Sequence, residues 1–158
     1  MLIVEDGNGI ADAESFASVA FADEWLGDRG GADWLALSTS EKEINLRKAT
    51  DYMVETYRFL DTPLTEGQGL PMPGVKLGYP PAIAIACVML ADRVRTAVLS
   101  PDSDGRVVKR KYEEVVDAVK EETEYDTARR PARYPAVDQR LVGIAVRRGA
   151  GAFVALVR

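Results

Sequence analysis

The longest uninterrupted apolar stretch of the chain, residues 82–91, directly follows Pro80 and Pro81. Proline is tolerated in the first helical turn because the N–H groups there have no partner within the helix. The pattern therefore predicts a helix over about 80–99, stopped by Pro101. Because its first residues are apolar on every side, we expect other segments to surround it as a central core helix. The apolar stretch is too short to span a bilayer.

Residues 2–4 are apolar and precede a turn-forming segment rich in Gly and Asn, which predicts a short strand or extended arm. A helix follows, because apolar residues recur at helical spacing from Val19 to Leu26. Ser15 or Ser18 can cap its first turn. The helix is expected to end at Gly27 or a few residues later.

A second amphipathic helix is expected to begin at residue 41. Ser40 precedes Glu43 by three residues, which is the spacing of a capping box. The helix should run to about Phe59, with its apolar residues on one stripe. This stripe comprises Leu46, Ala49, Met53, Tyr57 and Leu60.

The chain beyond this helix contains its least regular segments. Residues 61–78 hold four glycines and three prolines, which predicts a loop with local turns. Residues 106–125 carry valines at helical spacing and also an alternation that fits strands, so the pattern allows either structure. Pro135 can open a short helix over 136–142. Residues 153–158 are apolar and strand-like.

These elements predict a mainly α fold. We expect a compact helical bundle around the central helix, with a small β element or hairpin arm and a strand-like C-terminal tail. One helical domain over 1–142 would contain the arm as an insertion at about 102–133, and the tail would cover 143–158. A length of 158 residues with 47% hydrophobic residues suits a single domain with its own core.

Charge is distributed unevenly along the chain, although the net charge is only −5. Residues 1–30 hold seven acids and one arginine, whereas residues 126–158 hold seven arginines and two aspartates. Such a division indicates two surfaces that meet different partners, or that meet each other between copies. Scattered solvated charges are an equally ordinary explanation.

The composition excludes several kinds of active site. The chain has no histidine and one cysteine, Cys87, so catalysis by Ser-His-Asp or Cys-His and zinc sites built on these residues are absent. Cys87 lies in the apolar stretch and is expected to be a small buried residue in a reducing compartment. Neighbouring glutamates such as Glu113 and Glu114 point apart and make a poor acid/base pair. The loop at 67–69 lacks the Lys of a phosphate-binding loop. We expect no enzyme activity, cofactor or metal, and no export signal marks the N-terminus.

Arginines and tyrosines near the C-terminal end form the candidate interaction surface. Guanidinium groups and tyrosine rings can contact phosphates and stack on bases, but a dedicated DNA-binding domain is usually basic and this chain is net acidic. The alternative is that the arginines contact carboxylates of neighbouring subunits. The residues are Arg129, Arg130, Arg133, Arg140, Arg147 and Arg148, with Tyr125 and Tyr134 nearby.

Several segments together resemble a known family of small tailed-phage and prophage proteins. They are residues 2–30 (LIVEDGNGIADAESFASVAFADEWLGDRG), the Ala-Thr-Asp-Tyr segment at 49–52 with Tyr57, the Pro80-x-x-Ile83 helix start, and the segment at 134–141 (YPAVDQRL). Members are often labelled DnaT-like single-stranded-DNA-binding proteins and are similar to head-tail connector, adaptor or head-completion proteins. This chain has Phe21 at the position where the family pattern would place the Glu of a capping box after Ser18. The segment 106–125 is also longer than the family pattern leads us to expect.

The resemblance implies a structural protein of the virion neck that reaches the neck from the host cytoplasm. Its connector domain would assemble into a homo-oligomeric ring, a dodecamer, and contact the portal and a tail or tail-completion protein. DNA would pass through the lumen without sequence-specific binding, and no membrane is involved. The alternative function is a single-stranded-DNA-binding accessory protein of replication.

Two groups of residues acquire a role under the connector hypothesis. An apolar tail can add a strand to a neighbouring sheet, and acidic residues that line a lumen avoid attraction to phosphate. The predicted subunit, portal or tail contacts are the arginines above with Phe153, Val154, Leu156 and Val157. The predicted lumen-facing residues are Glu113, Glu114, Glu121, Glu122 and Glu124.

Overall fold

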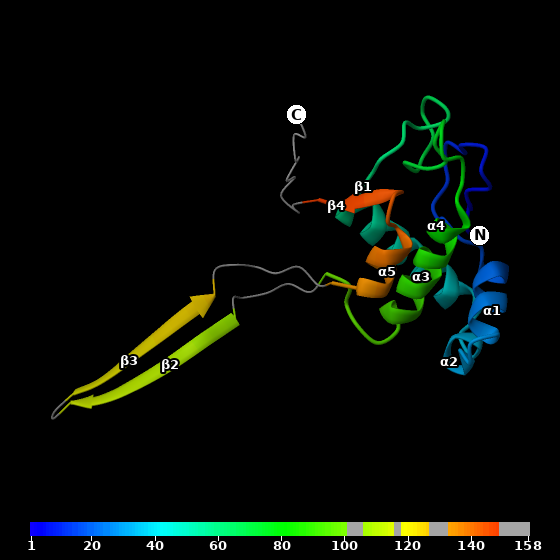
Figure 1. Ribbon diagram of the computed structural model, residues 1–158. Coiled ribbons are helices and arrows are strands. Elements are labelled where there is room, and N and C mark those ends of the chain that lie inside the picture. The colour runs from blue at the N-terminus through cyan, green and yellow to red at the C-terminus, as the bar shows by residue number, and fades with distance from the viewer. Residues whose placement is uncertain (101–105, 116–117, 127–132, 149–158) are drawn as a thin grey trace, which may run out of the picture. The chain divides into compact units, whose positions relative to one another are not determined.

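The computed structural model describes residues 1–100, 106–115, 118–126 and 133–148. These described residues are partly helical and contain two small two-stranded antiparallel sheets (Figure 1). The chain divides into two compact units. We call Met1–Leu99 with Tyr134–Arg158 the helical unit and Ser100–Arg133 the hairpin unit.

The N-terminal segment is an extended arm followed by a tight loop, as the pattern predicts. Val4 forms an isolated parallel bridge with Ser15. Helix α1 (Val19–Gly27) then begins after Ser18, whose hydroxyl accepts the N–H of Phe21 at 3.1 Å. The serine therefore caps the helix although Phe21 stands in the place of a capping-box glutamate. A short helix, α2 (Ala32–Leu35), follows.

Helix α3 (Thr39–Thr56) begins two residues earlier than predicted. Its capping box is formed by Ser38 and Glu41, not by Ser40 and Glu43. Both serines precede a glutamate by three residues, so sequence spacing cannot distinguish them. The earlier start leaves the Glu43 carboxylate in the second turn, where it pairs with Arg47 one turn further along.

The end of α3 was also predicted too far along the chain. The helix stops at Thr56 because strand β1 (Tyr57–Phe59) pairs with strand β4 (Ala145–Arg147). Leu60 is 50% exposed and does not belong to the buried stripe. The other four residues predicted for that stripe are buried.

Helix α4 (Pro81–Val94) is the central helix that the apolar stretch predicts. It packs against α1, α3 and α5, and the core residues it buries include Ile83, Cys87 and Leu90. The helix ends at Val94 instead of about residue 99, where the N–H groups of the next turn bond the Arg93 carbonyl. No helix in the described part of the chain is long and apolar enough to cross a membrane.

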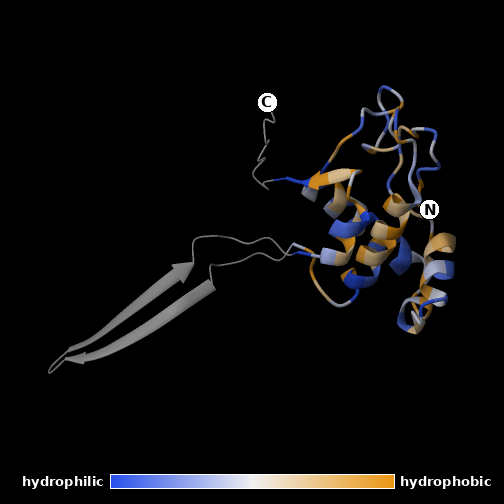
Figure 2. Ribbon diagram, in the orientation of Figure 1, coloured by the Kyte–Doolittle hydropathy of each residue, from blue (hydrophilic) through white to orange (hydrophobic). Residues whose placement is uncertain are grey.

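The remainder of the helical unit combines a long loop with a short helix. Residues 61–78 form no helix or strand, as predicted, and their turns are held by the Asp61 carboxylate. Helix α5 (Pro135–Arg140) starts at the predicted proline and stops before Gly143, which has a φ of 79°. Figure 2 shows hydrophobic and hydrophilic residues interspersed along the helices of the helical unit.

The hairpin unit resolves the ambiguity of residues 106–125 in favour of strands. Strand β2 (Arg106–Val115) pairs antiparallel with strand β3 (Ala118–Asp126), and the register shifts once between Val107 and Lys109. Oppositely charged residues stand in register at several positions of this ribbon. The pairs are Arg106 with Asp126, Lys109 with Glu124, Lys111 with Glu122 and Glu113 with Lys120.

Candidate functional site

The structure separates the predicted contact arginines into three groups. Arg133, Arg140 and Arg148 are exposed. The Arg147 side chain is only 12% exposed. The remaining predicted contacts lie outside the described residues: Arg129, Arg130, Phe153, Val154, Leu156 and Val157.

The predicted lumen-facing glutamates lie on the two strands of the hairpin unit. Glu113 and Glu114 belong to β2, and the other three, Glu121, Glu122 and Glu124, belong to β3. Three of the five are in register with a lysine of the opposite strand. A lysine in register offsets part of the negative charge that a glutamate contributes to the ribbon.

In the helical unit, the elements β1, β4 and α5 meet at a set of polar contacts. The Tyr57 hydroxyl donates to Asp138 Oδ1 at 2.5 Å, and Arg147 Nη1 lies 3.5 Å from the same oxygen. The Arg147 guanidinium also lies 5.8 Å from the centre of the Tyr57 ring. Burial, followed by the bond to Asp138, raises the pKa of Tyr57 above its usual range. Tyr57 is therefore a neutral hydrogen-bond donor, and Arg147 holds β4 to α5.

A second aromatic contact lies beside this one, where α5 begins. The Arg93 guanidinium is 5.4 Å from the centre of the Tyr134 ring, and the Tyr52 ring packs edge-on against the same ring at 5.6 Å. The Tyr134 hydroxyl donates to the Leu99 carbonyl at 3.3 Å. Tyr134 is partly exposed and Arg93 is exposed. We call Tyr52, Tyr57, Tyr134, Arg93, Asp138 and Arg147 the tyrosine–arginine cluster.

Exposed arginines surround the tyrosine–arginine cluster. Within the helical unit, Arg140 ends α5, and Arg148 follows β4 with its Nε donating to the Tyr57 carbonyl at 3.2 Å. Arg58 of β1 is exposed as well, in register with Val146. Such a surface can attract phosphate groups and offers one partly exposed ring for stacking.

Sequence reasoning found part of this cluster and missed the rest. It selected Tyr134 and Arg147 but assigned Tyr57 to an apolar stripe and gave no role to Arg93. Arg93 and Tyr134 come together only because α5 packs against α4. A signal was present, because Tyr52, Tyr57 and Asp138 all lie in segments that carry the family resemblance.

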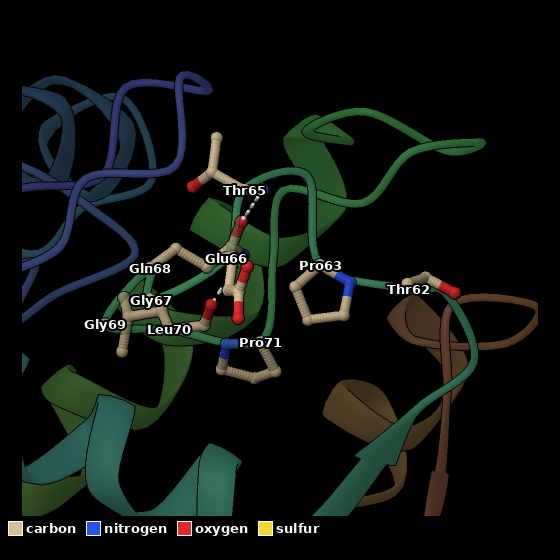
Figure 3. Close-up of a pocket in the computed structure, with 9 residues that line it drawn as sticks. All are labelled: Thr62, Pro63, Thr65, Glu66, Gly67, Gln68, Gly69, Leu70 and Pro71. Carbon is tan, nitrogen blue, oxygen red and sulfur yellow. Dashed lines mark hydrogen bonds between the residues drawn. The ribbon is translucent and has the colours of Figure 1, made fainter.

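The loop at 61–78 borders a surface pocket of about 490 Å³ (Figure 3). The Gln68 amide is used within the loop: its oxygen accepts the Thr65 N–H at 3.0 Å, and its nitrogen donates to the Leu70 and Pro73 carbonyls. Glu66 is the only titratable residue among the lining residues. The pocket therefore offers no catalytic set. It is lined by Thr62, Pro63, Thr65, Glu66, Gly67, Gln68, Gly69, Leu70 and Pro71.

Two glycines show that this loop is more closely fitted than a flexible turn. A Cβ on Gly69 would lie 2.5 Å from the Ala11 carbonyl oxygen, and one on Gly74 would overlap the Asp61 side chain. Both positions require the absence of a side chain. In the described residues, no group of three or more His, Cys, Asp or Glu is placed to hold a metal ion.

Comparison with known proteins gives one result. A family model described as DnaT-like ssDNA binding protein matches residues 1–158. No curated protein and no solved structure matches the chain.

Proposed function

We propose that this chain, which belongs to the DnaT-like ssDNA binding protein family over its whole length, binds single-stranded DNA as an accessory protein. The family match is the observation that carries the proposal. The exposed arginines around the tyrosine–arginine cluster are the part of the described surface that suits this ligand. Guanidinium groups contact the phosphates, and the Tyr134 ring with Arg93 offers a stacking position.

The distribution of charge along the chain determines how strong and how salt-dependent this DNA binding should be. Seven arginines and two aspartates occupy residues 126–158, whereas the whole chain has a net charge of −5. A local basic surface on an acidic protein attracts phosphate only at short range, within about one Debye length. We therefore expect weak binding without sequence preference that declines steeply as salt increases.

Fluorescence anisotropy with a labelled oligo-dT across a salt series tests the proposal. Each phosphate contact contributes about 0.7 to the slope of log K against log salt for single strands. The double variant Arg133→Gln/Arg140→Gln should therefore bind more weakly and lower the magnitude of this slope by about 1.4. Both residues are exposed, so the variant should fold normally.

The matched control is Arg29→Gln. Arg29 is also exposed and lies over an aromatic ring, that of Trp25 at 4.1 Å, but it belongs to the acidic N-terminal region. Its replacement should leave binding unchanged. Absence of binding even at low salt, or equal losses in both variants, would overturn the proposal.

A structural role in a virion neck is the second candidate function. The observation that favours it is the division into a helical unit and a separate hairpin unit, the organisation that the resemblance to connector proteins implies. The family description names single-stranded DNA and no virion component. Native mass spectrometry of the chain with a portal protein and tail components tests this role. A chain that stays monomeric and binds none of them contradicts it.

A further inference from the structure

The small sheet formed by β1 and β4 has an inner and an outer face, because side chains alternate along each strand. Tyr57 and Arg147 stand in register on the inner face, where both contact Asp138 of α5. The next pair in register, Arg58 with Val146, therefore lies on the outer face. Both residues of this pair are exposed. The outer face is thus turned away from the contacts that Tyr57 and Arg147 make.

The pairing of the two segments continues for one residue pair beyond each end of the strands. The Leu60 N–H bonds the Ile144 carbonyl, and the Arg148 N–H bonds the Thr56 carbonyl. Leu60 and Arg148 lie on the outer face as well, because each is two residues from a member of the outer pair. Leu60 is 50% exposed, and Arg148 is also exposed.

We call Arg58, Leu60, Val146 and Arg148 the outer sheet face. Along the strand direction its order is Arg148, then Arg58 beside Val146, then Leu60. The face is therefore basic at one end and apolar at the other. The Arg148 Nε donates to the Tyr57 carbonyl at 3.2 Å, which holds this arginine against β1. Successive rows of the face are about 6.6 Å apart, the distance that two residues of a strand span.

The loop at 61–78 extends the apolar end of the outer sheet face. Leu77 is 43% exposed, and its N–H bonds the carboxylate of Asp61, the residue that directly follows Leu60. The same carboxylate accepts two further backbone N–H groups of the loop. The apolar end is therefore a preformed surface, and the nearest carboxylate on the chain is occupied by backbone hydrogen bonds.

We infer that the outer sheet face binds an extended acidic peptide of a partner protein. Carboxylates of the peptide lie at the basic end, where guanidinium groups suit paired hydrogen bonds. Aliphatic side chains of the peptide lie at the apolar end, where they leave water. Alternate residues of an extended peptide have the same spacing of about 6.6 Å as the rows of the face. The four residues of the face include no aromatic ring on which a base could stack, which favours a peptide over single-stranded DNA. The inference does not depend on the proposed DNA binding.

Fluorescence anisotropy with a labelled synthetic peptide tests the inference on the full chain. The probe is a peptide of four aspartates followed by Leu-Thr-Leu. It should bind at least about tenfold more tightly than a peptide with asparagines in place of the aspartates, and than one with serines in place of the leucines. Equal binding of the three peptides, or no binding of the first at low salt, overturns the inference.

A pair of matched variants tests whether the outer sheet face is the binding surface. Arg58→Gln/Leu60→Ser changes two exposed residues, so it should fold normally, and it should bind the acidic peptide at least about tenfold more weakly. The control Arg29→Gln/Leu35→Ser makes the same changes at two other exposed residues, and Leu35 is 47% exposed. The control should bind like the wild type. Equal losses in both variants would contradict the assignment.

Two further measurements on the same variants distinguish the acidic peptide from other occupants. Displacement of the peptide by oligo-dT, together with an equal loss of oligo-dT binding in Arg58→Gln/Leu60→Ser, would make the face part of a DNA surface and overturn the inference. Self-association that this variant abolishes, seen by light scattering, would make a second copy the occupant and also overturn it. Loss of peptide binding alone supports the inference, whether or not the wild-type chain binds oligo-dT.

Discussion

At the scale of single residues, Glu5 shows how one buried carboxylate organises a loop. It is 2% exposed, and its two oxygens accept the backbone N–H groups of Gly7, Gly9 and Ile10 at 2.8, 3.0 and 2.9 Å. Gly7 and Gly9 both have positive φ, which brings their N–H groups around the carboxylate. The acidic N-terminal segment thus contains at least one charge with a structural role.

Replacing Glu5 with Ala should destabilise the fold by about 2–3 kcal/mol, because three partly buried N–H groups lose their acceptor. Urea denaturation measures this loss. Asp12→Ala removes an exposed acid from the same segment and should change the free energy of unfolding by less than about 0.5 kcal/mol. Equal effects of the two changes would contradict the role assigned to Glu5.

Tyr57 predicts how stability depends on alkaline pH. Burial and the bond to Asp138 raise its pKa in the folded state above the ordinary value near 10. Above about pH 10 the unfolded chain releases the tyrosine proton while the folded chain keeps it, so stability falls as pH rises. Tyr57→Phe should reduce this fall, measured by urea denaturation between about pH 8 and 11. An unchanged pH dependence would contradict the buried donor.

At the scale of elements, the start of α3 is decided by one of two similar serines. The Ser38 hydroxyl accepts the Glu41 N–H at 3.3 Å, and the Glu41 carboxylate accepts the Ser38 N–H at 2.9 Å. Ser40 lies within the first turn and is exposed. The two serines therefore form a matched pair for substitution.

Ser38→Ala should cost about 1 kcal/mol of stability because the capping hydrogen bond is lost. Ser40→Ala should change stability by less than about 0.5 kcal/mol. Thermal unfolding followed by circular dichroism compares the two variants. A larger loss of stability for Ser40→Ala than for Ser38→Ala would contradict the helix start at Thr39. It would favour the start at residue 41 that the sequence pattern predicts.

At the scale of the whole molecule, the helical unit has its own core and its two chain segments meet where the hairpin unit is inserted. The Tyr134 hydroxyl bonds the Leu99 carbonyl, and α5 packs against α4. Replacing Ser100–Arg133 with a short Gly-Ser linker should therefore leave a cooperatively folding protein. Shortening the connection costs little, because loop-closure entropy changes only slowly with length.

Thermal unfolding of this shortened chain should remain a single transition, within a few degrees of the wild-type Tm. Loss of the transition would mean that the hairpin unit is required for the fold of the helical unit. DNA binding by the shortened chain would show whether the exposed arginines that it retains are sufficient for binding single-stranded DNA.

The sequence by itself determined the features that depend on local pattern. Continuous apolarity predicted the central helix, clustered Gly and Pro predicted the loop at 61–78, and Pro135 predicted the start of α5. These signals act within a few residues, so they are visible without the fold. The absence of histidine likewise excludes histidine-based catalysis whatever the fold.

Only the tertiary structure decided the features that depend on competition or on distant segments. Ser38 and Ser40 both have the spacing of a helix cap, and the structure shows that Ser38 forms it. Residues 106–125 fit both periodicities, and the pairing of β2 with β3 decided for strands. The end of α3 depends on a partner strand near residue 146, and the Arg93–Tyr134 contact depends on α4 and α5 packing together. Hydrogen bonds and burial between distant segments outweigh local preferences that differ by less than about 1 kcal/mol.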